Sequence, residues 1–201
     1  MAYWKRTHTT LAAFLTVALT ATLFTTPTHA KELAIWDQLQ GTNPKGYVLL
    51  MRHALAPGVG DPENFNVNDC STQRNLSEEG RQDAREIGQW LQRREVKILR
   101  VESSRWCRAK ETAQLLNIGK VRPNKNLDSL FQESDLLNHP QTANIKKRIQ
   151  SHRNTRGLLV FVGHFVNFQA VAGVSLDSGE GVLIKATPSG EFKVMGYSPK
   201  P

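Results

Sequence analysis

Two unbroken apolar runs dominate the pattern of polar and apolar positions along the chain. One covers Tyr47–Met51, directly after the turn-forming residues 43–46, and the other covers 157–162. Runs without polar alternation are typical of strands that are buried on both faces of a sheet. We therefore expect two central strands, one ending just before His53 and the other just before His164.

Helical periodicity follows and separates these strands. Apolar residues recur at helical spacing from Ser77 to Arg94, and Ser77 is the expected N-cap. Ser103 or Ser104 is expected to cap a later helix that ends at Asn117. The remaining periodic segments predict strands over 96–101, 180–186 and 191–197, and helices over 141–152 and from 164 to 172.

The order of these elements predicts an α/β domain with a mostly parallel central sheet. In such sheets ligands bind beyond the carboxyl ends of the strands. His53 and His164 both lie at such ends, so we expect them to project into one crevice, although they are 111 positions apart. Residues 54–75 are rich in Pro, Gly, Asn and Asp and are expected to form a long surface loop.

The first residues of the chain have the features of an export signal. Lys5 and Arg6 precede the apolar stretch Leu11–Phe24, which is short for a membrane span, and Thr28-His29-Ala30 is typical of a cleavage site. We expect residues 1–30 to be a cleavable secretion signal and residues 31–201 to form a single domain in the periplasm or outside the cell. A retained membrane anchor is the alternative, but we expect no stable membrane insertion after cleavage.

The positive charge of the chain favours anionic partners, but the charge alone does not identify which kind of anion is bound. The formal net charge is +8, and it falls to +6 once Lys5 and Arg6 are removed with the leader. A basic excess attracts phosphorylated small molecules, nucleic acid or anionic lipid. No nucleic-acid-binding motif is present, so we expect no nucleic-acid partner.

Cys70 and Cys107 are the only two cysteines. An oxidising compartment permits them to pair, but pairing depends on a Cα separation that the sequence does not give. A disulfide and two free thiols both remain open.

Four blocks of sequence, in this order, resemble the histidine phosphatase superfamily, also called the phosphoglycerate-mutase-like superfamily. The blocks are Leu50–Ala54, Gln73–Arg81, Ser103–Ala113 and Val160–His164. The resemblance implies a three-layer α/β/α fold with a catalytic group formed by Arg52, His53, Arg108 and His164. Ala54 departs from the pattern, because the family usually has glycine after the nucleophilic histidine.

The chemistry of phosphoryl transfer explains why these residue types are needed. A neutral imidazole such as that of His53 attacks phosphorus when its other ring nitrogen is fixed as a donor. Arg52, Arg108 and His164 would then stabilise the charge on the equatorial oxygens, without a metal ion or other cofactor. Further substrate contacts are expected from Arg74 and Asn167.

The leaving alkoxide needs a proton, and the resemblance implies an acidic residue that supplies it. Glu133 is the first candidate for this general acid, and Asp135 and Asp128 remain alternatives.

The sequence thus predicts a metal-independent phosphomonoester hydrolase with a phosphohistidine intermediate on His53. The expected substrate is a phosphorylated small molecule or an envelope sugar phosphate, such as lipopolysaccharide core heptose phosphate. The alternatives are a non-catalytic envelope module that binds phosphorylated ligands and an enzyme of the phosphohistidine or phosphoglycerate type.

Overall fold

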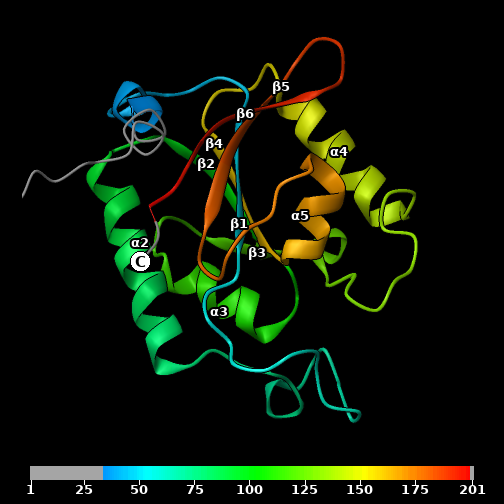
Figure 1. Ribbon diagram of the computed structural model, residues 1–201. Coiled ribbons are helices and arrows are strands. Elements are labelled where there is room, and N and C mark those ends of the chain that lie inside the picture. Colours follow the sequence, from blue (N-terminus) through cyan, green and yellow to red (C-terminus); the bar gives the residue numbers. More distant parts are fainter. Residues whose placement is uncertain (1–33, 200–201) are drawn as a thin grey trace, which may run out of the picture.

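The computed structural model describes residues 34–199 of the 201-residue chain (Figure 1). The described part opens with a helical segment at 34–39. The predicted leader at 1–30 lies outside the described residues. No helix within residues 34–199 combines the length and apolar character that crossing a membrane requires.

A six-stranded sheet forms the centre of the protein, with the strand order β3-β2-β4-β1-β5-β6. Strands β1 to β4 are mutually parallel, whereas β5 runs antiparallel to both β1 and β6. The predicted mostly parallel sheet is therefore confirmed, with an antiparallel pair at one edge. The strands are β1 (Tyr47–Arg52), β2 (Ile98–Ser103), β3 (Val121–Pro123), β4 (Leu158–Gly163), β5 (Gly181–Ala186) and β6 (Phe192–Tyr197).

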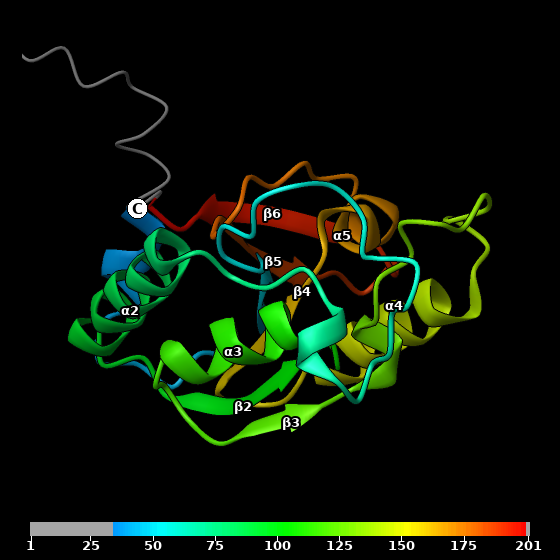
Figure 2. The ribbon, with the colours of Figure 1, turned by 90° about the horizontal axis from the view of Figure 1, so that it is seen from below.

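Four helices cover the two faces of this sheet, as Figures 1 and 2 show. Helices α2 and α3 lie on one face, and α4 and α5 lie on the other. Their bounds are α2 (Glu78–Arg93), α3 (Cys107–Leu115), α4 (Pro140–His152) and α5 (Phe165–Ala172). The α/β/α layering is the predicted one.

The apolar run of β1 is divided between two cores because successive side chains of a strand point to opposite faces. Leu49 and Met51 pack with residues of α2 and α3, and Val48 and Leu50 pack with residues of α4 and α5. All four side chains are fully buried. An unbroken apolar run was therefore the correct sign of a central strand.

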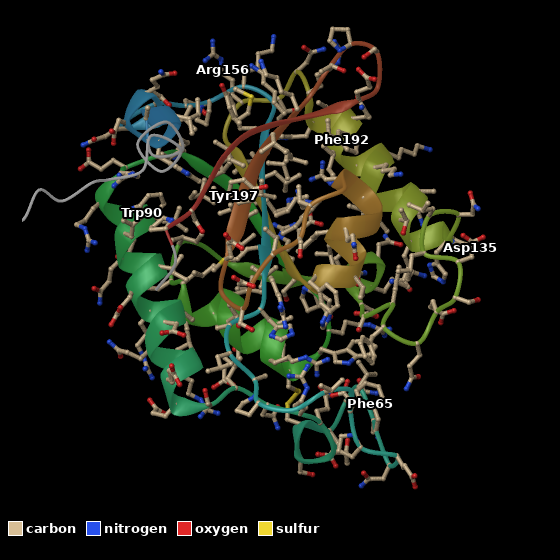
Figure 3. All side chains as sticks on the ribbon, in the orientation of Figure 1. Phe65, Trp90, Asp135, Arg156, Phe192 and Tyr197 are labelled. Atoms are coloured by element: carbon tan, nitrogen blue, oxygen red, sulfur yellow. A yellow bond between two sulfur atoms is a disulfide. The ribbon has the colours of Figure 1, made fainter. Side chains whose placement is uncertain are left out.

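Aromatic residues connect the helical segment at 34–39 to α2 and to the end of β6. The rings of Trp36 and Trp90 meet edge to face with their centroids 5.0 Å apart. Trp36 Nε1 donates a hydrogen bond to the backbone oxygen of Tyr197 at 2.8 Å. Figure 3 labels Trp90 and Tyr197, which lie on α2 and at the end of β6. These contacts join the first described helix to the end of the last strand.

Strand β2 differs from the prediction because it begins later and extends to Ser103. Glu102 and Ser103 pair with Phe161 and Val162 of β4 and are buried although they are polar. Asn124 Nδ2 donates to the carboxylate of Glu102 at 2.7 Å, and Arg148 Nη2 donates to it at 3.3 Å, so this buried charge is both hydrogen-bonded and paired.

The predicted cap of α2 is confirmed, and the predicted cap of α3 is wrong. Ser77 Oγ accepts a hydrogen bond from Gly80 N at 3.0 Å, as an N-cap should. Helix α3 begins at Cys107 after an N-cap at Trp106 that provides no side-chain hydrogen bond. Ser104 is buried, and its Oγ contacts His164 and accepts a hydrogen bond from Trp106 N at 3.2 Å, just before the helix begins.

A disulfide bond fastens the long loop between β1 and α2 onto the start of α3. Cys70 and Cys107 are joined with their Cα atoms 5.6 Å apart. Cys70 opens a short 3-10 helix, Cys70–Thr72, within the loop. Gln73 Oε1 also accepts a hydrogen bond from Cys107 N at 2.9 Å. Of the two states that the sequence left open, the structure shows the bridge.

Candidate active site

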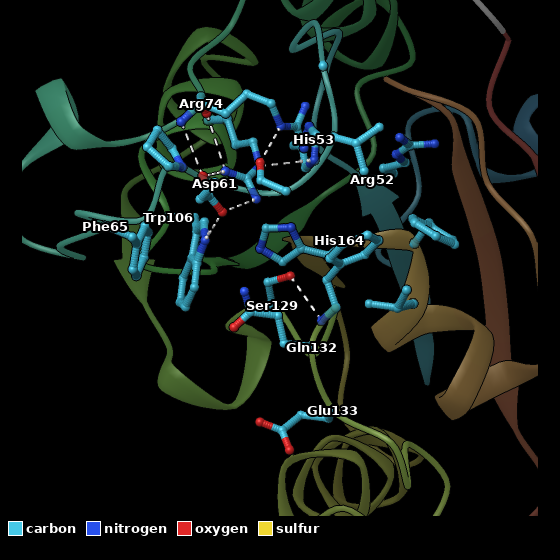
Figure 4. A pocket seen from close by; sticks show the side chains of 18 of the residues that line it. Arg52, His53, Asp61, Phe65, Arg74, Trp106, Ser129, Gln132, Glu133 and His164 are labelled. Atoms are coloured by element: carbon cyan, nitrogen blue, oxygen red, sulfur yellow. Dashed lines mark hydrogen bonds and ion pairs between the residues drawn. The ribbon is translucent and has the colours of Figure 1, made fainter.

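A cavity of about 610 Å³ opens at the carboxyl ends of β1 and β4 (Figure 4). The expected convergence of distant residues is seen in its lining, because six of the predicted site residues contribute to it: Arg52, His53, Arg74, Arg108, Glu133 and His164.

His53 follows β1 directly and is only 3% exposed. Its Nδ1 lies 2.8 Å from the backbone oxygen of Ala54, and because a carbonyl can only accept, Nδ1 carries the proton. Nε2 then presents a lone pair, which accepts a hydrogen bond from Arg108 Nε at 3.3 Å. Burial lowers the pKa of His53 to about 3, and the charges of nearby arginines act in the same direction. The imidazole is therefore neutral at physiological pH.

His164 stands between the end of β4 and the start of α5, where it is the N-cap residue. Its ring centroid lies 5.3 Å from that of His53, and its Nε2 lies 3.0 Å from Ser104 Oγ. Burial lowers the pKa of His164 well below its usual value, and the positive charges of Arg108, Arg74 and Arg52 add to this effect. A second neutral imidazole thus faces the same cavity.

Two arginines at the cavity wall are anchored by backbone oxygens. Arg52 Nη1 donates to Leu176 O at 3.1 Å, whereas its buried Nε has no acceptor among residues 34–199. Arg74 Nε donates to Gly60 O at 2.8 Å, and its Nη1 donates to Ala56 O. Burial lowers the pKa of both guanidinium groups, but a guanidinium remains charged at physiological pH.

Arg108 is the arginine of α3 that lines the cavity, as the sequence register predicted. Its side chain is 3% exposed and forms a two-bond ion pair with Asp61, with Nη1–Oδ1 and Nη2–Oδ2 distances of 2.7 and 3.1 Å. Arg105, the neighbouring arginine that the register excluded, donates from Nε to Asp128 Oδ2 at 2.7 Å.

Asp61 is the main cavity residue that sequence reasoning missed. It lies in the long loop after β1, and Figure 4 shows its carboxylate among the side chains of the cavity wall. Burial by itself would raise the pKa of Asp61, but the hydrogen bonds and charge of Arg108 outweigh burial and lower it. The loop has no periodicity, so only the contact itself distinguishes Asp61 from other loop acids.

Trp106 was also missed as a cavity residue. Its ring stacks on Phe65 with the centroids 4.9 Å apart, and its Nε1 donates to Asp61 Oδ2 at 3.0 Å. Phe131 and Gln132 also line the cavity. The lining therefore combines aromatic and polar groups with the cationic side chains of Arg52, Arg74 and Arg108.

Asn167 does not reach the cavity, which corrects its predicted role as a substrate contact. It is fully buried on α5, where its side chain accepts from Leu130 N at 3.2 Å and donates to Asp128 O at 2.8 Å. These bonds hold the 128–130 segment, whose Ser129 lines the cavity.

The three acids proposed for proton transfer lie in different surroundings. Glu133 is exposed and lines the cavity, and Figure 4 shows it apart from the group of His53 and His164. Asp128 is buried and engaged by Arg105. Asp135 is exposed and accepts hydrogen bonds from Asn138. Of the three, the structure brings only Glu133 into the cavity lining.

The described residues include no group of three or more His, Cys, Asp or Glu side chains that could hold a metal ion.

Comparison with protein families gives one match. The model of the histidine phosphatase superfamily (branch 1) matches residues 48–156, a range that includes His53, Arg108 and Glu133. No curated protein sequence matches the chain significantly.

Several solved structures share the fold at low sequence identity. The protein histidine phosphatase SixA complexed with tungstate is 17% identical with a TM-score of 0.58, and the match covers 76% of this chain and 96% of that one. A phosphoserine phosphatase from Entamoeba histolytica in complex with 3-phosphoglyceric acid is 13% identical with a TM-score of 0.56 and coverages of 77% and 97%. A mycobacterial glucosyl-3-phosphoglycerate phosphatase is 14% identical with a TM-score of 0.53 and coverages of 77% and 99%. At these identities the likeness concerns the fold alone.

Proposed function

Because this chain belongs to the histidine phosphatase superfamily and is a phosphatase, we propose that it hydrolyses phosphomonoesters through a phosphohistidine on His53, without a metal ion. The observation that carries this proposal is the fixed tautomer of His53. Its Nδ1 proton is directed at Ala54 O, so the Nε2 lone pair is available inside the cationic cavity.

In the first step, the Nε2 lone pair of His53 forms a bond to phosphorus as the ester P–O bond breaks. Arg52, Arg108 and His164 stabilise the charge on the equatorial oxygens. In the second step, water attacks phosphorus, the N–P bond breaks, and phosphate leaves with His53 restored.

Glu133 is the proposed general acid for the leaving alkoxide and the base that later takes a proton from water. Its support is position, because it lines the cavity while Asp128 and Asp135 are held by other side chains. Arg74 is proposed as a further phosphate contact at the same wall.

For the substrate we propose an envelope sugar phosphate, such as lipopolysaccharide core heptose phosphate. The support is the lining of the cavity, in which the Phe65–Trp106 stack and Gln132 combine aromatic surface with a polar group. Aromatic faces with a few polar groups suit a hydroxyl-rich ring. A non-catalytic envelope module that binds phosphorylated ligands is the competing proposal, and a phosphohistidine or phosphoglycerate substrate is a further alternative.

We also propose that the protein works in the periplasm or outside the cell, as residues 31–201 after removal of the leader. The disulfide supports this placement, since such bonds persist in oxidising compartments. N-terminal sequencing of the exported protein should give Lys31 as the first residue, and an intact N-terminus would contradict cleavage.

The function is tested with p-nitrophenyl phosphate in the presence of EDTA. The mature protein should turn this ester over, and His53→Ala should abolish the activity while melting at the same temperature. His139→Asn, a change at a histidine outside the cavity lining, is the control that should remain active.

A negative result across a panel of phosphomonoesters would favour the binding module. The same panel separates the substrate classes when sugar phosphates, phosphoglycerate and a phosphohistidine peptide are compared by kcat/KM.

A further inference from the structure

Asp61 has no part in the reaction as proposed, yet it forms a two-bond ion pair with Arg108. Its two carboxylate oxygens pair with Nη1 and Nη2 of Arg108 at 2.7 and 3.1 Å. The side chains of Arg108 and Asp61 are only 3% and 15% exposed, so water screens the pair little. A contact of this kind fixes the plane of the guanidinium group.

The geometry of Arg108 shows which of its donors remain available. A guanidinium has five N–H donors. Nη1 donates to Asp61 and to Arg74 O, Nη2 donates to Asp61, and Nε donates to His53 Nε2 at 3.3 Å. The one remaining N–H belongs to Nη2 and lies on the same side of the group as Nε–H. This Nε–Nη2 edge is the one that faces the nucleophile.

Asp61 is itself held in place from two directions. Trp106 Nε1 donates to Oδ2 at 3.0 Å, and the backbone N–H of Arg74 donates to Oδ1 at 3.1 Å. The disulfide ties this loop to Cys107, the residue next to Arg108. The disulfide therefore links the loop that carries the Asp61 carboxylate to the helix that carries the Arg108 guanidinium.

We propose that Asp61 is a positioning residue that orients Arg108 for phosphoryl transfer. It binds the end of the guanidinium group, so that the Nε–Nη2 edge stays directed at His53 and takes a phosphoryl oxygen when the substrate enters. The inference rests on the proposed function of the cavity. Its competitor is that Asp61 occupies the phosphate position itself and must leave before an anion can bind.

The two ideas predict opposite changes in anion affinity, which Asp61→Asn and Asp61→Ala can measure. Asparagine keeps one oxygen acceptor for Arg108, whereas alanine keeps none. If Asp61 orients Arg108, kcat/KM for p-nitrophenyl phosphate should fall roughly tenfold in the asparagine variant and on the order of a hundredfold in the alanine variant. The dissociation constant of inorganic phosphate, measured by calorimetry, should rise in the same order.

Asp69→Asn is the matched control, because Asp69 lies in the same loop, is exposed and does not line the cavity. It should keep wild-type kinetics. Melting temperatures identify any loss of activity that is due to unfolding. At a temperature where all variants are folded, a purely structural role of Asp61 predicts no graded loss of kcat/KM.

Tighter phosphate binding in the Asp61 variants would overturn the proposal in favour of a competing carboxylate. Kinetics equal to those of Asp69→Asn would also overturn it. Phosphate affinity is measured without turnover, so an inactive wild-type protein would refute the proposed hydrolysis and still leave the orientation of Arg108 testable.

A double variant of Asp61 and Arg108 provides a second measurement, because it tests whether Asp61 acts through Arg108. In an Arg108→Lys background, Asp61→Asn should change phosphate affinity little, since an ammonium group has no planar edge to orient. An undiminished effect in that background would contradict action through Arg108.

Discussion

His53 owes its protonation state to its surroundings. It is buried, and Arg52, Arg74 and Arg108 place positive charge around it, so protonation of its ring is opposed by both desolvation and repulsion. The same arginines that would bind a phosphoryl group therefore keep the nucleophile neutral. The positive charge of these arginines therefore both attracts a phosphoryl group and lowers the pKa of His53.

The low pKa of His53 links protein stability to pH. The folded pKa of about 3 lies below the ordinary value of 6.5, so the unfolded chain binds a proton more readily in acid. The contribution of His53 to stability is fully present above about pH 6.5 and is lost as the pH falls toward 3, with a slope of up to about 1.4 kcal/mol per pH unit.

Urea unfolding at a series of pH values checks this slope. His53→Gln does not titrate, so its free energy of unfolding should fall less steeply between pH 6.5 and about 4 than that of the wild type. Parallel curves for the two proteins would show that the pKa of His53 is the same in the folded and unfolded states.

At the scale of elements, α2 and α3 approach each other closely, and the contact depends on a glycine. Gly88 faces α3, and a Cβ atom placed on it would lie 2.2 Å from the backbone oxygen of Leu116. Helix α3 carries Arg108, so the spacing between the two helices also affects the position of the cavity wall.

Gly88→Ala should therefore destabilise the protein by about 1–3 kcal/mol, the usual cost of overpacking, because backbone rather than a flexible side chain must move. Helix propensity alone predicts the opposite sign, a gain of about 1 kcal/mol. The free energy of unfolding in urea decides between them. Gln89→Ala, at the exposed neighbouring position, is the control that should change stability little.

At the scale of the whole molecule, the disulfide is the main covalent constraint on the long loop. It joins positions 37 residues apart and fixes the segment that carries Asp61 and Arg74 against the start of α3. The cavity wall is thus built from two parts of the chain that the fold brings together and the bridge locks.

Replacing both cysteines, as Cys70→Ser with Cys107→Ser, should lower the free energy of unfolding by about 4 kcal/mol if loss of chain entropy in the unfolded state dominates. The wild type should lose a similar amount on treatment with a thiol reductant, and the double variant should be insensitive to it. A wild-type protein whose stability is unchanged by reductant would show that the bridge adds no constraint.

The sequence by itself determined five of the six strands, helices α2 to α5 and the meeting of His53 with His164, but its pattern did not predict the short strand β3 or the helix at 34–39. Apolar runs and helical spacing are local patterns, so Tyr47–Met51 and the α2 helix could be read directly. The carboxyl ends of parallel strands share one edge of a sheet, so His53 and His164 could be placed together without coordinates.

Only the tertiary structure decided the loop contacts and the orientation of individual side chains. Asp61 reaches Arg108 across 47 positions, and Asn167 turns away from the cavity toward the backbone of Asp128 and Leu130. Neither outcome has a periodic signal, because a loop follows no repeating geometry and a buried amide bonds whichever backbone groups the packing leaves unpaired. The disulfide belongs to the same class, since it depends on a distance between Cα atoms that only the folded chain defines.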